Sequence, residues 1–295
     1  MDQFVQQIIN GISLGSIYAL IALGYTMVYG IIKLINFAHC DVYMLGAYIG
    51  YFCMTILHLD VIPSLLIAMM LCTVVGVLIE KIAYKPLRNA TRIAVLITAI
   101  GVSLFLEYGT MYFVSAQVRT FPPRIVKSMS AGIKLGNINV TYMQLMIVGV
   151  TVLLMVLLQF TVKKTRIGKA MRAVSLDVDA AELMGINVDT TISFTFALGS
   201  ALAGAAGVLV GLYYNSINPL MGMLPGLKAF VAAVFGGIGI IPGAMIGGYF
   251  IGMVETFVSG YGYSMYRDAV VFAILILILI IKPAGLLGRN VREKV

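Results

Sequence analysis

Charged residues, histidine and tryptophan are scarce in this chain of 295 residues. Charged side chains make up 11% of the chain and hydrophobic side chains 61%, with two histidines and no tryptophan. Soluble domains are about half apolar and about one quarter charged. A water-soluble fold cannot hide so much apolar surface, so we expect a membrane protein whose solvent is lipid.

Several catalytic and metal-binding patterns are missing as well. No glycine-lysine pair is followed by serine or threonine, so the chain has no Walker A loop for ATP. It also has no His-Glu-x-x-His and no Cys-x-x-Cys, and we expect no metal site and no catalytic site. The odd number of cysteines argues against a disulfide framework. The net charge is +8, but the cations cluster in short loops, so we expect no nucleic-acid partner.

Apolar runs follow one another along the whole chain. One of them is interrupted by glycines and a proline between Gly236 and Gly243, and we expect two shorter helices to form a hairpin around this break. The predicted fold is an all-α, polytopic transmembrane helix bundle of about 8–9 spans, in a single domain over residues 1–295. The runs cover residues 5–32, 41–57, 61–79, 93–114, 142–162, 190–214, 226–258 and 268–281.

Lysine and arginine predict how the bundle is oriented. Basic residues at Lys33, at 81–92, at 163–172 and near the C-terminus all fall on one side in an alternating topology, and the cytosol is the side that short basic loops prefer. This topology puts the N-terminus outside and lets the hairpin enter and return from outside. The basic loop at 115–140 would lie outside and is the exception. The C-terminal cations are Lys282, Arg289, Arg292 and Lys294.

The polar segment 163–189 separates its charges, with cations first and acids after them. In its first part Ile167, Met171 and Val174 recur at helical spacing, which predicts an amphipathic helix at the lipid interface. In its second part Asp179 and Glu182 resemble a helix N-cap with a capping box.

Gly185 suits the C-terminal cap of the same short helix. A helix over 179–184 would present small and apolar side chains to a groove of a cytosolic partner. An ordinary solvated loop is the alternative. The side chains presented would be Ala180, Ala181, Leu183 and Met184.

Ionisable residues inside apolar runs are functional candidates because their charge is costly in lipid. Glu107, Glu255 and Lys228 are such residues, and His39 and Asp41 lie at the boundary of a run. Pairing across helices is the alternative for these groups. A secondary carrier that works without an ATPase is the alternative function.

Two further patterns concern serine and glycine. Gly11-Ile-Ser13-Leu-Gly15 matches the G-x-S-x-G nucleophile elbow, but the elbow needs a preceding strand and this run predicts a helix, so a hydrolase centred on Ser13 is disfavoured. Glycines four residues apart predict closely packed helices.

The sequence also suggests an internal repeat of the kind found in transporters. Gly15-Ser16, Ile35-Asn36 and Met44-Leu45 resemble Gly199-Ser200, Ile217-Asn218 and Met223-Leu224.

Motifs along nearly the whole chain resemble the branched-chain amino acid ABC transporter permease family of the LivH/LivM type, and its LivH-like branch in particular. One matching motif is Ile35-Asn-Phe-Ala-His39, but the residue that follows it differs from the family pattern. The family usually has glycine there, and this chain has Cys40. The other matching segments are Gly15–Gly24, Leu45–Tyr48, Thr165–Val174, Asp179–Ile186, Leu202–Val208, Lys228–Gly237 and Pro242–Gly248.

The resemblance implies a permease subunit of an ATP-driven importer in the cytoplasmic (inner) membrane of a bacterium or archaeon. Its implied partners are a second permease subunit (a LivM-like paralogue), two ABC ATPase subunits that bind the ATP, an external solute-binding protein and membrane lipid. The chain itself would need no cofactor. Branched-chain, hydrophobic amino acids are the implied substrates, and urea, short amides or another small solute are the alternatives.

The resemblance also implies site residues. The segment 163–189 would be the cytosolic loop that docks on an ATPase, and the expected docking residues are Arg172, Asp177, Asp179, Ala180, Ala181, Glu182, Leu183, Met184 and Gly185. The residues expected to line the pathway are Asn36, Phe37, His39, Asn218, Gly236, Gly237 and Pro242.

Overall fold

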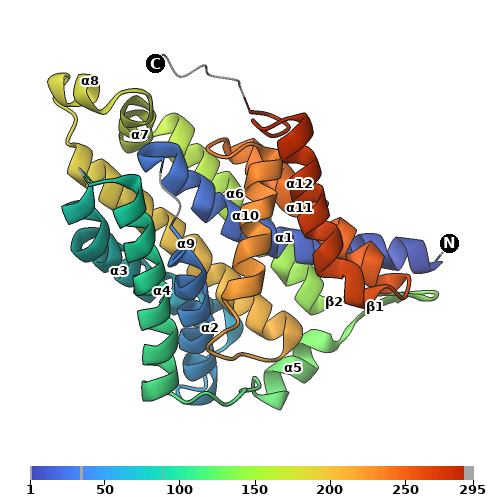
Figure 1. Cartoon of the computed structure of the whole chain (residues 1–295). Coiled ribbons are helices and arrows are strands. Elements are labelled where there is room, and N and C mark those ends of the chain that lie inside the picture. Colours follow the sequence, from blue (N-terminus) through green and yellow to red (C-terminus); the bar gives the residue numbers. More distant parts are fainter. Residues whose placement is uncertain (1, 34–35, 89, 289–295) are drawn as a thin grey trace.

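The computed structural model describes residues 2–33, 36–88 and 90–288, and it is almost entirely helical (Figure 1). The expected all-α bundle is confirmed. The α-helices are α1 Asp2–Ile32, α2 His39–Thr55, α3 Val61–Ile79, α4 Arg92–Phe113, α5 Pro123–Ser130, α6 Tyr142–Lys164, α7 Arg166–Leu176, α8 Val178–Leu183, α9 Val188–Tyr214, α10 Met223–Gly236, α11 Ile241–Gly260 and α12 Arg267–Ile281. A π-helical turn, η1 Glu80–Tyr84, and the 3₁₀ turns η2 Lys85–Leu87 and η3 Ser264–Tyr266 complete the helical elements.

Seven helical segments of the described chain are long and apolar enough to cross a membrane. The helices α2 and α10 are shorter, with 17 and 14 residues. The predicted hairpin is confirmed, because α10 ends at Gly236 and α11 begins at Ile241. The close approach of these two helices requires glycine, since a Cβ on Gly236 would overlap the backbone of Gly243.

The core of the bundle is formed by α1 and α9, which are buried along most of their length. Both are apolar on every side, as is typical of a helix enclosed by others. The two helices cross where Gly24 and Gly199 meet, each lying against the backbone of the other helix. By contrast, α4, α6 and α12 expose most of their apolar surface, as expected for helices that contact lipid.

The predicted role of the paired glycines is confirmed at the helix contacts. Gly15 of α1 lies against Tyr249 and Gly252 of α11, and Gly46 of α2 lies against Gly204 of α9. Side chains at these positions would hold the helix backbones apart. The glycines therefore bring α1 against α11 and α2 against α9.

The helices α1–α4 and α9–α12 repeat one packing scheme. In the first set α2 packs on α3 and α4, while α3 packs on the central α9; in the second set α10 packs on α11 and α12, while α11 packs on the central α1. The two sets run in opposite directions through the bundle, as in inverted-topology repeats of transporters. This arrangement supports the repeat that the sequence suggested, with α2 and α10 as equivalent helices.

The loops gather at two ends of the bundle, as the alternating topology predicts. At one end Gln6 and Asn139 exchange hydrogen bonds of 2.9 and 3.1 Å between the N-terminus and the segment after α5. At the other end Lys85 pairs with Asp189 at 2.6 Å, beside residues of α7 and α8. We refer to these as the outer and inner ends, according to the predicted orientation. Arg289, Arg292 and Lys294 lie outside the described residues.

The outer segment 115–140 has more structure than a loop. It contains α5 and the first strand of an antiparallel hairpin, β1 Gly132–Leu135 and β2 Ile138–Thr141. The sequence carries a signal for this hairpin, because Gly136-Asn137 separates two short runs of strand-forming residues. In the structure Gly136 has a φ of +62°, which suits such a turn.

Candidate docking element and transport pathway

The helices α7 and α8 form a compact element at the inner end of the bundle. Helix α7 begins directly after α6, where the Thr165 side chain accepts from the Gly168 amide at 3.1 Å. Arg172 donates to the backbone carbonyl of Val162 at the end of α6 and remains exposed. These contacts fix the direction of α7 against α6.

The apolar side of α7 faces the protein. Met171 and Val174 are buried, and α7 packs against α1, α6 and α9. The expectation that this side lies in the lipid interface is therefore wrong. The reason is that the inner ends of α1 and α9 offer apolar surface directly beside α7.

Helix α8 begins at Val178, one residue earlier than predicted, and its N-cap lies two residues earlier than predicted. The N-cap is Asp177, whose side chain accepts from the Ala180 amide at 3.0 Å, and Asp179 lies in the first turn. The predicted capping role of Asp179 is therefore wrong. The helix ends at Leu183, one residue before the predicted end, and Gly185 terminates it as predicted, with a φ of +81° that favours glycine.

The tip of this element exposes large apolar side chains. The exposed fractions of Leu183 and Met184 are 88% and 82%, and that of Leu176 is 85%. Ala181 is buried instead and points into the bundle, so its predicted place on the presented face is wrong. Helix α8 packs against α7 and α9, so one of its sides is covered.

A hollow of about 810 Å³ lies between the α7–α8 element and the inner ends of α1 and α9. Its walls carry both signs of charge, and they include Lys33, Lys85 and Arg88 as well as Asp179 and Glu182. The hollow has room for side chains of another protein.

An ion-pair network connects the start of α9 to the end of α3. Asp189 pairs with Lys85 and with Arg88, and Arg88 also pairs with Glu80, which is fully buried. Ser193 of α9 donates to Glu80 at 2.7 Å. The sequence does not predict this network, because Asp189 and Ser193 lie far along the chain from Glu80 and Arg88, and the charges resemble those of ordinary loops.

The next contact reaches the beginning of α2. The Tyr84 hydroxyl donates to the side-chain oxygen of Asn36 at 2.8 Å, and both residues are buried. Asn36 is one of the predicted pathway residues. It lies in the turn that starts α2, beside Phe37, which is half-buried, and His39, which is buried against Gly24 and Tyr25 of α1.

The other predicted pathway residues do not join this group. Asn218 lies in the segment between α9 and α10, where its side chain accepts from the Leu220 amide at 3.0 Å. Gly236 and Gly237 are buried against α11 and the segment 284–288. Pro242 is the second residue of α11. Residues 36–39 and Asn218 lie at or before the starts of α2 and α10, whereas Gly236 and Gly237 pack against α11 and the segment 284–288. That these residues line a pathway stays a prediction.

The ionisable residues inside the bundle divide into two groups. Lys228 of α10 lies 2.8 Å from Glu255 of α11 and 2.6 Å from Asp268 of α12, and the Tyr18 hydroxyl donates to Glu255 at 2.7 Å. This is the pairing across helices that was the alternative for these residues. Asp41 and Glu107 form the second group, on α2 and α4.

Ser13 has no features of a catalytic nucleophile. Its hydroxyl donates to the Ile9 carbonyl at 3.0 Å within the continuous helix α1. A nucleophile elbow requires a turn between a strand and a helix. The geometry therefore excludes that arrangement at Ser13.

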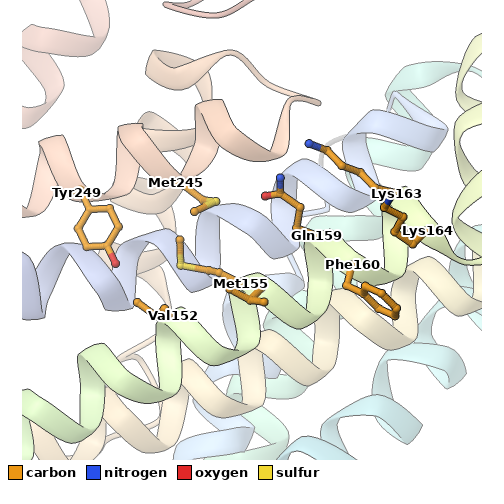
Figure 2. A pocket seen from close by; sticks show the side chains of 9 residues that line it. Val152, Met155, Gln159, Phe160, Lys163, Lys164, Met245 and Tyr249 are labelled. Carbon is orange, nitrogen blue, oxygen red and sulfur yellow. The ribbon is translucent and has the colours of Figure 1, made fainter.

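A separate groove of about 610 Å³ runs between α6 and α11 (Figure 2). Met155, Phe160 and Met245 make its wall apolar, and Lys163 and Lys164 lie at its inner end. Long basic side chains at this position suit a helix that leaves the hydrocarbon layer. The groove contains none of the predicted docking or pathway residues.

Comparisons with known proteins agree with these features. The family model described as branched-chain amino acid transport system / permease component matches residues 7–279. Over 301 aligned residues the chain is 43% identical to the high-affinity branched-chain amino acid transport system permease protein BraD of Pseudomonas aeruginosa. It is 44% identical to the corresponding protein LivH of Escherichia coli, and each alignment covers 99% of this chain and 98% of the relative.

A more distant relative extends the match to an archaeon. The probable branched-chain amino acid transport permease protein LivH of Methanocaldococcus jannaschii is 30% identical over 289 residues, which cover 92% of this chain and 89% of that protein. Such proteins are transport components and not enzymes. Because the family model and these relatives match the chain almost from end to end, the chain belongs to the family of branched-chain amino acid transport permeases.

Proposed function

We propose that the chain is a membrane-spanning subunit of an ATP-driven importer for branched-chain amino acids in the cytoplasmic membrane. Its family membership and the match over the whole length of BraD and LivH support the substrate class. The chain has no Walker A loop, so separate ATPase subunits bind the ATP. A second permease subunit, a paralogue of this chain, completes the pore, and an external solute-binding protein delivers the amino acid.

The α7–α8 element, within the segment 163–189, is proposed as the place where an ATPase docks. The observation that carries this assignment is the exposed apolar tip at Leu176, Leu183 and Met184, at the end of the bundle that the basic loops assign to the cytosol. Exposed apolar clusters of this kind mark protein–protein contacts. The charged hollow beside the tip is suited to polar side chains of the same partner.

The proposed mechanism is alternating access driven through rigid contacts. Closure of the ATPase pair moves α7 and α8, and the hydrogen bonds and apolar packing of α7 transmit this motion to the inner ends of α6 and α9. From α9 the motion passes through Asp189, Arg88 and Glu80 to η1. The Tyr84–Asn36 hydrogen bond then reaches the beginning of α2.

The docking assignment is tested with the complete transporter reconstituted in proteoliposomes. Met184→Glu is expected to lower co-purification of the ATPase and ATP-dependent leucine uptake by at least about tenfold, since a charge replaces an apolar contact. The matched control is Met265→Glu, because Met265 is 95% exposed at the outer end. Normal ATPase binding by Met184→Glu would refute the docking site.

The wild-type transporter tests the function itself. Uptake of leucine, isoleucine and valine is expected to require ATP, the ATPase subunits and the solute-binding protein together. Uptake by the chain alone along a proton gradient would instead identify a secondary carrier. Preferential uptake of urea or an amide would assign another substrate class.

A further inference from the structure

Two helices of the bundle, α2 and α10, meet at their first residues. Helix α2 begins at His39 and α10 at Met223, and Cys40 of α2 packs directly against Gly222 and Gly226 at the start of α10. Each N-terminus exposes the positive end of a helix dipole. The two equivalent helices of the repeat therefore direct partial positive charge toward one place.

A buried carboxyl group lies at this meeting point. Asp41 is 1% exposed, and its Oδ1 lies beside Gly222, directly before α10. Neither carboxyl oxygen of Asp41 has a hydrogen-bond partner of normal geometry among the described residues. Its polar neighbours are Ser103 and Glu107 of α4, and Glu107 is itself 7% exposed.

The two halves of the repeat differ at this position. In the α10–α12 half, Lys228 and Arg267 balance the charges of Glu255 and Asp268. In the α2–α4 half, the described contacts bring Asp41 and Glu107 together without a basic side chain. Two buried carboxylates repel each other and are stabilised by a cation or a proton between them.

We propose that Asp41, assisted by Glu107, binds the ammonium group of the amino acid during transport. This inference rests on the proposed function, since the ammonium is the cationic group of a branched-chain amino acid. The N-terminal end of α10 lies beside Asp41 and favours the carboxylate of the same zwitterion. Met223 and Leu224, which are 60% and 51% exposed, offer apolar surface for the branched side chain.

The rival explanation is structural, because an aspartate beside a helix N-terminus also stabilises that helix. The substitution Asp41→Asn separates the two explanations. Asparagine caps a helix about as well as aspartate and has nearly the same shape, but it carries no charge for an ammonium group. Asp41→Glu keeps the charge, and the exposed Asp60→Asn is the matched control.

The experiment uses the complete transporter in proteoliposomes, with ATP and solute-binding protein loaded with radiolabelled leucine. Initial uptake rates give kcat and KM with respect to the loaded binding protein, and ATP hydrolysis is measured in parallel. For Asp41→Asn we expect kcat for leucine to fall at least about tenfold, which equals about 1.4 kcal/mol. ATP hydrolysis and KM are expected to stay within about twofold, because docking at either end is untouched.

Asp41→Glu is expected to restore uptake to within about threefold of the wild type, and Asp60→Asn to leave it unchanged. Normal leucine uptake by Asp41→Asn would overturn the proposal, and so would a parallel fall of uptake and ATP hydrolysis. Failure of the wild type to carry branched-chain amino acids would instead refute the proposed function. The two failures are therefore distinguishable in one set of vesicles.

Discussion

Removing the negative charge of Glu255 is expected to destabilise the outer half of the bundle. Glu255 is 2% exposed, and its two carboxyl oxygens accept from Lys228 at 2.8 Å and from Tyr18 at 2.7 Å. In the variant Glu255→Gln, Lys228 stays buried with only Asp268 as its counter-ion. Breaking a buried pair on one side costs about 3–5 kcal/mol.

The remaining contact with Asp268 at 2.6 Å puts the expected loss at the lower end of that range, at about 3 kcal/mol. For chains of about 150–250 residues, each kcal/mol lowers the melting temperature by about 2–4 °C. We therefore expect the detergent-purified variant to melt about 6–12 °C below the wild type. The assay is thermal unfolding followed by loss of the monodisperse peak in size-exclusion chromatography.

A double variant provides the control. Replacing both partners, Lys228→Met with Glu255→Leu, removes the charges together and is expected to recover most of the lost stability. The cycle is completed by the single variants Lys228→Met and Glu255→Leu, and the coupling between the two positions should exceed about 1 kcal/mol. A single variant that melts within about 1 °C of the wild type would show that the pair contributes little.

Two further predictions concern contacts between helices. Gly252→Val is expected to separate α1 from α11, since its Cβ would overlap the backbone of Gly15, and to lower the free energy of unfolding by at least about 2 kcal/mol. The control Gly101→Val, on an open face of α4, should retain normal yield and thermal stability. Tyr84→Phe leaves the side-chain oxygen of Asn36 buried without its donor and is expected to cost about 1–3 kcal/mol. Melting curves measure that loss of stability. A lower ratio of leucine uptake to ATP hydrolysis would show that the hydrogen bond also transmits motion, and an unchanged ratio would contradict that role.

The features that the sequence predicted well are those that depend on local composition. A continuous apolar run determines a helix in lipid, and the glycines and Pro242 determine where the hairpin breaks. Cap residues are also local, but the choice between Asp177 and Asp179 depends on which turn of α8 packs on α9. The short-range pattern favours Asp179, because Glu182 follows three residues later, but the Ala180 amide donates to Asp177 in the structure.

The contacts that connect distant parts of the chain could not be predicted in this way. Glu80 is fully buried yet charged, and its partners Arg88 and Ser193 come from two different elements. A single sequence shows that Glu80 is costly in an apolar surrounding but not which residue neutralises it. Likewise, the boundary position of Asp41 gave no sign that Glu107, 66 positions later, lies beside it.

The repeat gives a physical reason why the two halves of the bundle perform different tasks. A charge-balanced contact, such as Lys228 with Glu255 and Asp268, holds α10, α11 and α12 together without any ligand. The equivalent contact between α2 and α4 places two acids together, so its stability depends on a cation or a proton between them. An amino acid that binds there supplies that cation and favours one arrangement of α2 and α4 over another. In the proposed mechanism, the Tyr84–Asn36 hydrogen bond connects the ATPase to this same half, whose packing would then respond to the substrate.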